Sequence, residues 1–174
     1  MTSACAAGPR LDELERQARD AGLLLRLKVG RPLGLWSLHL VVAQQSQNGS
    51  LRWLGNMKAW AYPAASGLQL DTMRVMPSAP AGVGDLIWSA TMAWTLEMTP
   101  CRTARLLAIR DDERQHQRLL RYFRCFGFEA VRSVDAALWD MPLRLIWGGA
   151  GMLMTGDCAR VQTISQRRWR QSAA

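Results

Sequence analysis

Residues 68–86, LQLDTMRVMPSAPAGVGDL, set the architecture of the whole chain. They begin with alternating apolar and polar residues, then pass two glycines, Gly82 and Gly84, into a nearly uncharged segment rich in Trp, Met and Ala. The pattern predicts a strand over residues 68–76 and a helix over residues 86–98 that is buried against a sheet. A glycine-rich turn that opens a helix directs backbone N–H groups at one place, so it favours an anion. The same glycines also suit an ordinary strand-to-helix turn.

Upstream of this stretch, the sequence predicts one helix followed by a meander of strands. The helix covers residues 11–22 and is amphipathic, with apolar residues on one side and charges on the rest. Three strands are expected over residues 23–29, 35–43 and 51–62, and the pair Asn48-Gly49 suits a tight hairpin between the last two.

Downstream, strand and helix alternate. A short buried strand is expected over residues 104–109, a polar helix over 111–125 and a strand over 128–134, and residues 137–146 are expected to supply a last strand. Alternation of this kind implies at least one parallel pairing inside a mixed sheet. The predicted fold class is therefore α/β (α+β), with a mixed, mostly antiparallel twisted sheet flanked by helices.

Length and composition limit the class of protein. A chain of 174 residues with 49% hydrophobic content suits one domain, expected over residues 1–160 and followed by a basic C-terminal tail over 161–174. The apolar runs are shorter than the ~20 residues of a membrane span, and the N-terminus lacks the pattern of a secretory signal. A cytoplasmic protein without a membrane span is expected. The four cysteines are scattered and only two histidines are present, so no metal site is expected.

The net charge of +8 favours polyanionic partners, which include phosphorylated cofactors, nucleic acids and acidic protein surfaces. The basic tail around Trp169 is more typical of a solvated terminus than of a nucleic-acid contact, because single-strand binding surfaces usually repeat their aromatic residues. No nucleic-acid motif is present, so a nucleic acid is not the expected partner. An exposed Trp-rich edge would favour a homodimer.

The order of motifs over residues 68–134 resembles the GNAT superfamily of N-acetyltransferases. Val75-Met76-Pro77 matches the V-x-P that ends the fourth strand in that family, Gly82 and Gly84 match the two glycines of its pyrophosphate turn, and Phe126-Gly127-Phe128 resembles its closing motif. The resemblance implies acetyl-CoA as the cosubstrate. It also implies that a backbone amide near Val75 holds the thioester carbonyl. The residues implied in binding the cosubstrate are Val75, Ala81, Gly82, Val83, Gly84 and Asp85.

The turn departs from the family pattern in its charges. Ala79 stands where the family has Gln or Arg, and Ala81 stands where a basic residue is common, so the turn lacks its cationic side chain. Asp85 places a negative charge beside the expected phosphates, or caps the helix instead. The binding site for the diphosphate would therefore depend on backbone amides.

The resemblance also implies an acid and a base. Asp71, four residues before Val75, stands where the family often has a carboxylate that deprotonates the acceptor amine; the alternative is an ion pair with Arg74 or with an arginine on a neighbouring strand. The family's Tyr acid corresponds to Phe123, and Tyr122 is one residue, or about 100° of helix, away.

His116 occupies the position of an Asn that often begins this helix in the family. A histidine there could contact the pantetheine or take part in proton transfer. The alternative is a partly exposed helix residue without a catalytic task. Asp111, Asp112 and Glu113 resemble an acidic cluster that stabilises a helix N-terminus.

Three hypotheses follow. The chain is an acyltransferase that moves an acetyl group from acetyl-CoA to a primary amine of a small molecule or a protein. Alternatively, it is a catalytically inactive GNAT-fold protein that binds a protein partner or serves in assembly. The third hypothesis, based only on the basic surface, is a nucleic-acid or ribosome binder.

Overall fold

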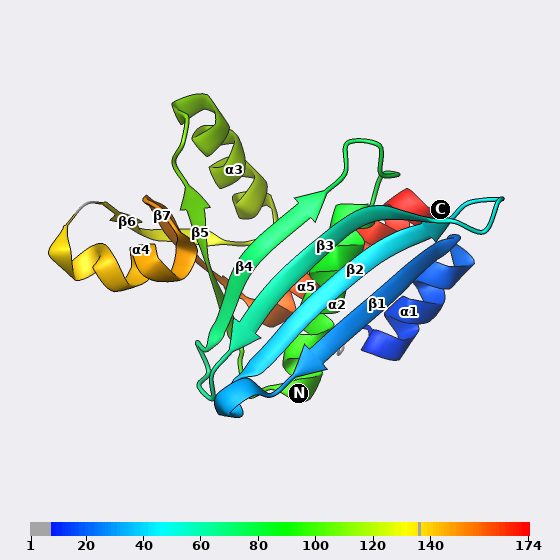
Figure 1. Cartoon of the computed structure of the whole chain (residues 1–174), viewed down its shortest axis with the longest axis horizontal. Helices are drawn as coiled ribbons and strands as arrows, with labels where there is room; N and C mark the ends of the chain where they lie inside the picture. The colour runs from blue at the N-terminus through cyan, green and yellow to red at the C-terminus, as the bar shows by residue number, and fades with distance from the viewer. Residues whose placement is uncertain (1–7, 136) are drawn as a thin grey trace, which may run out of the picture.

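The computed structural model describes residues 8–135 and 137–174, and its strands form a seven-stranded sheet in the order β1-β2-β3-β4-β5-β7-β6 (Figure 1). The strands are β1 Leu23–Gly30, β2 Trp36–Gln45, β3 Leu51–Ala61, β4 Leu68–Val75, β5 Thr103–Ile109, β6 Glu129–Val134 and β7 Gly151–Asp157. The helices are α1 Leu11–Asp20, α2 Val83–Met98, α3 Glu113–Cys125, α4 Met141–Trp147 and α5 Cys158–Ala173, with short 3-10 turns at Pro32–Gly34 and Leu138–Asp140. Only β4 and β5 are parallel. The predicted mixed, mostly antiparallel sheet flanked by helices is confirmed.

Strands β1 to β4 form an antiparallel meander with one face in the core. On β2, the side chains of Leu38, Leu40 and Val42 are buried, while the alternate residues are only partly buried. Because successive side chains of a strand point to opposite faces, this alternation assigns one face of the meander to the core and leaves the other accessible.

Helices α1, α2 and α5 pack on the core side of this meander and lie behind the strands in Figure 1. Helix α2 is buried around most of its circumference, which explains why its sequence carries almost no charge. None of the helices in the described ranges is both long and apolar enough to cross a bilayer.

The expected last strand was misplaced. Residues 141–147 form helix α4, in which Pro142 sits in the first turn and Gly148 ends the helix in the left-handed region. The strand is β7, whose glycines weakened its signal, and it lies between β5 and β6. A strand buried between two neighbours loses the alternation that would identify it.

The expectation of a solvated basic tail was also wrong. Residues 158–173 form helix α5, and Trp169 is only 2% exposed. Half of the buried residues of α5 are polar, namely Gln162, Ser165 and Gln166, and each of these makes a hydrogen bond. Hydrophobic periodicity does not detect a helix buried through such a network.

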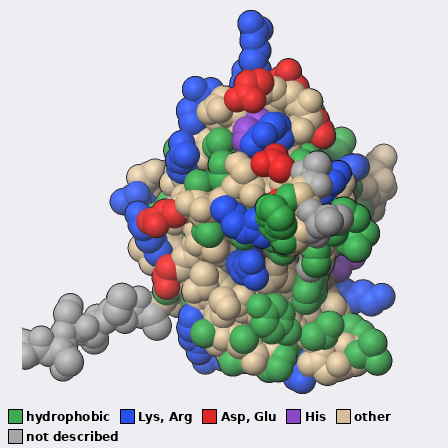
Figure 2. All heavy atoms as spheres, turned by 90° about the vertical axis from the view of Figure 1, so that its left-hand side faces the viewer, with side chains coloured by type: hydrophobic (Ala, Val, Ile, Leu, Met, Phe, Trp, Pro, Cys, Tyr) green, Lys and Arg blue, Asp and Glu red, His purple; other side chains and the backbone are tan. Residues whose placement is uncertain are grey.

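The end of the molecule formed by α3, α4 and β6 faces the viewer in Figure 2, where hydrophobic side chains gather among basic ones. Val131, Trp139 and Leu145 are among its exposed apolar residues. A homodimer through an exposed apolar edge stays a prediction.

Candidate functional site

Strands β4 and β5 separate soon after they begin. Their parallel pairing is confined to Leu68 with Ala104 and Gln69 with Arg105, although both strands continue for several residues. Beyond this short pairing the two strands diverge, as the wide gap between their arrowheads in Figure 1 shows. The sheet therefore opens between β4 and β5 toward their C-terminal ends.

The edge of β4 that faces this opening has backbone groups that β5 does not pair. The amide of Met76 donates to the carbonyl of Leu54 on β3, at 2.8 Å. Because hydrogen bonds in an antiparallel ladder alternate, the N–H and C=O of the preceding residue, Val75, point away from β3 and toward the opening. A ligand that entered there could add hydrogen bonds to β4.

The turn between β4 and α2 carries further amides without acceptors. Within the described residues, no hydrogen bond reaches the N–H groups of Ala81, Gly82, Gly84 or Asp85, whereas the Val83 amide lies 3.4 Å from the carbonyl of Pro80. The first amides of a helix are normally satisfied by a capping side chain, water or a ligand, and α2 has no side-chain cap. Four of the five predicted turn residues thus present free donors, while Val83 is fully buried.

Gly82 adopts a left-handed conformation with φ of 89° and packs closely against α5. A Cβ at this position would lie 2.7 Å from Cβ of Ser172 and 3.1 Å from the ring of Trp169. Glycine is therefore required here by the contact with α5, as well as by the backbone conformation. One side of the turn is covered by protein atoms.

Asp85 forms an ion pair that sequence reasoning missed. Its Oδ1 lies 3.0 Å from Nε of Arg168 on α5, without the alignment of a hydrogen bond. The guanidinium of Arg168 also stacks over the ring of Phe126, at 4.7 Å. Burial raises the pKa of Asp85 above its usual range, and the charge of Arg168 partly opposes this rise. Asp85 does not cap α2, and a cation from α5 stands beside a turn that has none of its own.

The hydroxyl of Tyr122 on α3 reaches the start of α2. It accepts a hydrogen bond from the indole Nε1 of Trp88, at 2.9 Å. A Cβ built on Gly84 would lie 3.7 Å from this hydroxyl and from the ends of Met73 and Val75 on β4. Tyr122 therefore extends to the β4 edge despite standing one position before the family's tyrosine. Burial raises the pKa of Tyr122, although the hydrogen bond from Trp88 acts in the opposite direction.

Phe123, which occupies the family's position, is part of an aromatic cluster. Its ring packs edge-on against Trp88 and Phe128. The one-residue offset between Tyr122 and Phe123 is explained by this packing, which places the phenylalanine in the core and leaves the tyrosine toward α2.

Asp71 lies in a β-bulge, since the pairing of β3 with β4 shifts between Lys58 and Ala59 and leaves Asp71 without a partner residue. It follows the last residues of β4 that pair with β5, so it stands near the narrow end of the opening. The side chain is exposed and makes no ion pair or hydrogen bond within the described part of the chain, so the alternative of a pair with Arg74 is not observed.

His116 is buried rather than partly exposed, with 3% of its surface accessible. Its Nδ1 lies 3.2 Å from the carbonyl of Ile109 at the end of β5. The ring therefore links α3 to β5, which is a structural task. The carboxylate of Asp112 accepts from the Gln115 amide, so the predicted acidic N-terminus of α3 is confirmed at this residue.

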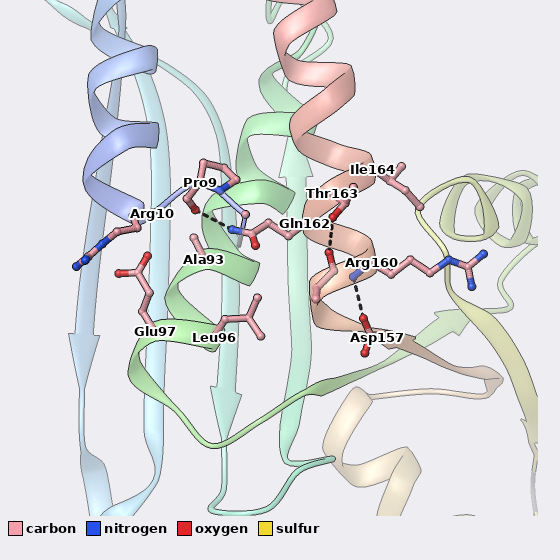
Figure 3. Close-up of a pocket in the computed structure, with 12 residues that line it drawn as sticks. Pro9, Arg10, Ala93, Leu96, Glu97, Asp157, Arg160, Gln162, Thr163 and Ile164 are labelled. Carbon is pink, nitrogen blue, oxygen red and sulfur yellow. Dashed lines mark hydrogen bonds between the residues drawn. The ribbon is translucent and has the colours of Figure 1, made fainter. Parts of the chain in front are cut away.

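A hollow of about 660 Å³ lies at the other end of α2, between the start of α1 and the start of α5 (Figure 3). Its polar walls are already engaged: Glu97 accepts from the Leu11 amide, and Gln162 donates to the Pro9 carbonyl. It is remote from the turn at Gly82, because it is lined by the last turns of α2.

Several solved structures with a similar fold carry the name of an acetyltransferase. The chain superposes on nourseothricin acetyltransferase with a TM-score of 0.50 and 14% sequence identity, over 80% of this chain and 92% of that one. It also matches a putative acetyltransferase of the GNAT family from Desulfovibrio desulfuricans (TM-score 0.48, 16% identity, 71% of this chain and 69% of that one). An aminoglycoside 6'-N-acetyltransferase complexed with coenzyme A matches with a TM-score of 0.42, at 13% identity, over 69% and 73% of the two chains.

The fold of this chain is therefore similar to that of nourseothricin acetyltransferase. No protein-family model matches the sequence, and no curated protein matches it. The likeness shown by these comparisons therefore lies in the architecture.

Proposed function

We propose that this protein is an acyltransferase that moves an acetyl group from acetyl-CoA to a primary amine of a small molecule or a protein. The observation that carries the proposal is the row of donors along one path: the Val75 amide at the edge of β4, followed by the free amides of the turn at Gly82. A diphosphate and an acyl chain attached to it would follow such a path. The cytoplasmic location expected from the sequence stays a prediction.

The residues present fit this cosubstrate. The amides of Ala81, Gly82, Gly84 and Asp85 would hold the diphosphate, and the dipole of α2 adds to their attraction. The Val75 amide would donate to the thioester carbonyl, where negative charge develops during transfer. Bound acetyl-CoA supplies an activated acetyl group.

Asp71 and Tyr122 would manage the protons. Asp71 is exposed and unpaired at the narrow end of the opening, so it can accept a proton from the acceptor amine, directly or through water. Tyr122 keeps its proton at neutral pH, since the ordinary pKa of tyrosine, 10.0, is well above 7 and burial raises it further, so its hydroxyl can donate to the departing thiolate. Trp88, which donates to the same oxygen, would stabilise the phenolate that results. His116 has no role in this proposal.

The test combines binding and turnover. Acetyl-CoA at about 100 times its dissociation constant is expected to add roughly 2.7 kcal/mol to the free energy of unfolding. Release of free CoA should then be followed across a panel of primary amines. Asp71→Asn and Tyr122→Phe are each expected to lower kcat by about 100-fold or more while retaining the acetyl-CoA stabilisation. Absence of any stabilisation by acetyl-CoA would overturn the proposal.

A second candidate is a GNAT-fold protein that binds a partner without turnover. The contact of Ser172 and Trp169 with Gly82, together with Ala79 and Ala81 in place of polar or basic residues, favours it. Binding of acetyl-CoA without transfer of its acetyl group to any amine, and therefore without release of free CoA, would support this candidate over the first.

A further inference from the structure

Among residues 8–135 and 137–174, no helix covers the second face of the β1–β4 meander. Helices α1, α2 and α5 all pack on the opposite face, and the strands β1 to β4 lie in front of them in Figure 1. The bare face is four strands wide and belongs to the described part of the chain. It is a surface distinct from the β4–β5 opening.

Basic side chains occupy this face in two rows across the strands. Because Leu25 on β1 and Met57 on β3 are buried on the core side, their alternate neighbours point to the bare face. One row contains Lys28, His39, Lys58 and Thr72, which are successive partners in the strand register. The other row contains Arg26, Val41, Asn56 and Arg74, again as successive partners.

Within the described part of the chain, no ion pair neutralises the cations of this face. Between residues 21 and 84 the chain has six basic residues and a single acidic one, Asp71. Lys28 and Lys58, the only lysines of the protein, flank His39 around a shallow hollow of about 370 Å³. Like charges brought together on a bare surface indicate an anionic partner.

Aromatic rings share the face with these cations. On β3, Trp60 alternates with the buried Ala59 and Ala61, so it points to the bare side, and its ring lies 6.2 Å from that of Tyr62. At the far end of the same strand, Trp53 is 39% exposed and pairs with Ala43. Rings beside cations on an open antiparallel sheet provide stacking surfaces for bases next to contacts for phosphates.

We propose that the bare face of β1–β4 binds single-stranded nucleic acid. The two basic rows would contact the phosphates, and Trp53 and Trp60 would stack on bases. A second copy of this chain would place like charges against each other, and an acidic protein would leave the aromatic rings unexplained. The sequence did not predict a nucleic-acid partner, because its C-terminal segment is not typical of a binding surface and no nucleic-acid motif is present. The residues of the bare face come together only through strand pairing.

The test is fluorescence anisotropy of labelled single-stranded 12-mers, oligo-U RNA in one arm and oligo-dT in the other, titrated with the full chain at several salt concentrations. The double variant Lys28→Glu/Lys58→Glu is expected to weaken binding by at least about 10-fold and to lower the slope of log K against log salt by about 1.4, or about 0.7 for each lost phosphate contact. Trp53→Ala is expected to weaken binding by about 5-fold or more without changing the salt slope. Tighter binding of oligo-U or of oligo-dT identifies RNA or DNA, respectively, as the ligand of this face.

The matched control is Arg114→Glu/Arg118→Glu on α3, which makes the same change in net charge at exposed positions outside the face. It should weaken binding less than about 2-fold. Equal losses in the two double variants, or poly-glutamate of similar charge binding as tightly as the oligonucleotides, would overturn the proposal. So would the absence of binding at low salt. Thermal unfolding of each variant checks that the losses of affinity are measured on folded protein. Unaltered CoA release by the same variants would show that the nucleic-acid surface is separate from the proposed acyltransferase site.

Discussion

The two ends of helix α2 differ in what they leave unsatisfied. The C-terminal end borders the hollow of about 660 Å³, yet the polar side chains around it, Glu97 and Gln162, already have hydrogen-bond partners in the protein. At the N-terminal end, the amides of Ala81, Gly82, Gly84 and Asp85 have no acceptor among residues 8–135 and 137–174.

Unsatisfied backbone donors are therefore a better indication of a binding site than the volume of a hollow. An unpaired backbone amide that is partly withdrawn from water costs free energy, so a fold retains several of them together only where water or a ligand can take their place. A hollow with satisfied walls has no such requirement. The ligand of this protein is therefore expected at the N-terminal end of α2.

The largest expected effect concerns the contact between that end and α5. Trp169→Ala should lower the free energy of unfolding by about 3–5 kcal/mol, because it removes a buried indole that packs against Gly82 and donates to Gln17 on α1. Urea denaturation measures the change. Trp139→Ala, at a residue that is 78% exposed, is the control and should change the stability by less than about 0.5 kcal/mol. Similar small losses in both variants would mean that α5 does not stabilise the N-terminal end of α2.

The sequence predicted the order of elements from α1 to β6 within a few residues. The amphipathic elements were identified by an apolar face opposite a polar one, and α2 and β5 by their nearly uncharged, apolar sequences. It failed at β7 and α5 for physical reasons. Strand β7 pairs with neighbours on both sides and lacks a regular alternation of apolar and polar residues, and α5 buries Gln162, Ser165 and Gln166 through hydrogen bonds beside its apolar contacts.

The candidate site was predictable only in part. The turn amides follow from the glycine pattern, whereas Asp71 was implied only by the resemblance to the GNAT family. The approach of Tyr122 to Gly84 and the ion pair of Arg168 with Asp85 depend on how α3 and α5 pack against α2, and no local pattern in the sequence encodes that packing.

A smaller effect is expected from Gly82→Ala, which separates backbone strain from contact. Alanine in a left-handed conformation costs about 1–2 kcal/mol, and its Cβ would also lie 2.7 Å from Ser172. Gly49→Ala is the matched control, since Gly49 has a φ of 81° and nothing within 4 Å of a built Cβ. In urea denaturation, backbone strain should lower the free energy of unfolding of both variants. Only Gly82→Ala should show a larger decrease than this, and only Gly82→Ala should lose the stabilisation by acetyl-CoA.

The hollow at the other end of α2 provides a second control for that ligand effect. Ala159→Phe adds bulk to its wall at an exposed position and should leave the stabilisation by acetyl-CoA unchanged. If Ala159→Phe lost the stabilisation by acetyl-CoA while Gly82→Ala kept it, the ligand site would lie at the C-terminal end of α2 instead of the N-terminal end.

The smallest expected effect is the pH dependence of Asp85. Burial raises the pKa of Asp85 above its ordinary value of 3.8, so the folded protein holds this proton more tightly than the unfolded chain does. The stability gained from the protonated form is fully present below pH 3.8 and is lost as the pH rises through the folded pKa. Asp85→Asn stays neutral, so its stability relative to the wild type should increase over that range.

The charge of Arg168 affects the pH at which this change in stability occurs. Its charge lowers the pKa of Asp85, so Arg168→Gln should move the pH-dependent step to higher pH when urea midpoints of the wild type, Asp85→Asn and Arg168→Gln are compared from pH 3 upward. Asp85→Asn should also bind acetyl-CoA more tightly, because it removes a negative charge beside the free amides of the turn. If the difference in stability between the wild type and Asp85→Asn did not change with pH, Asp85 would have the same pKa in the folded and unfolded chains. The N-terminal end of α2 would then be more accessible to water than its contacts with α5 imply.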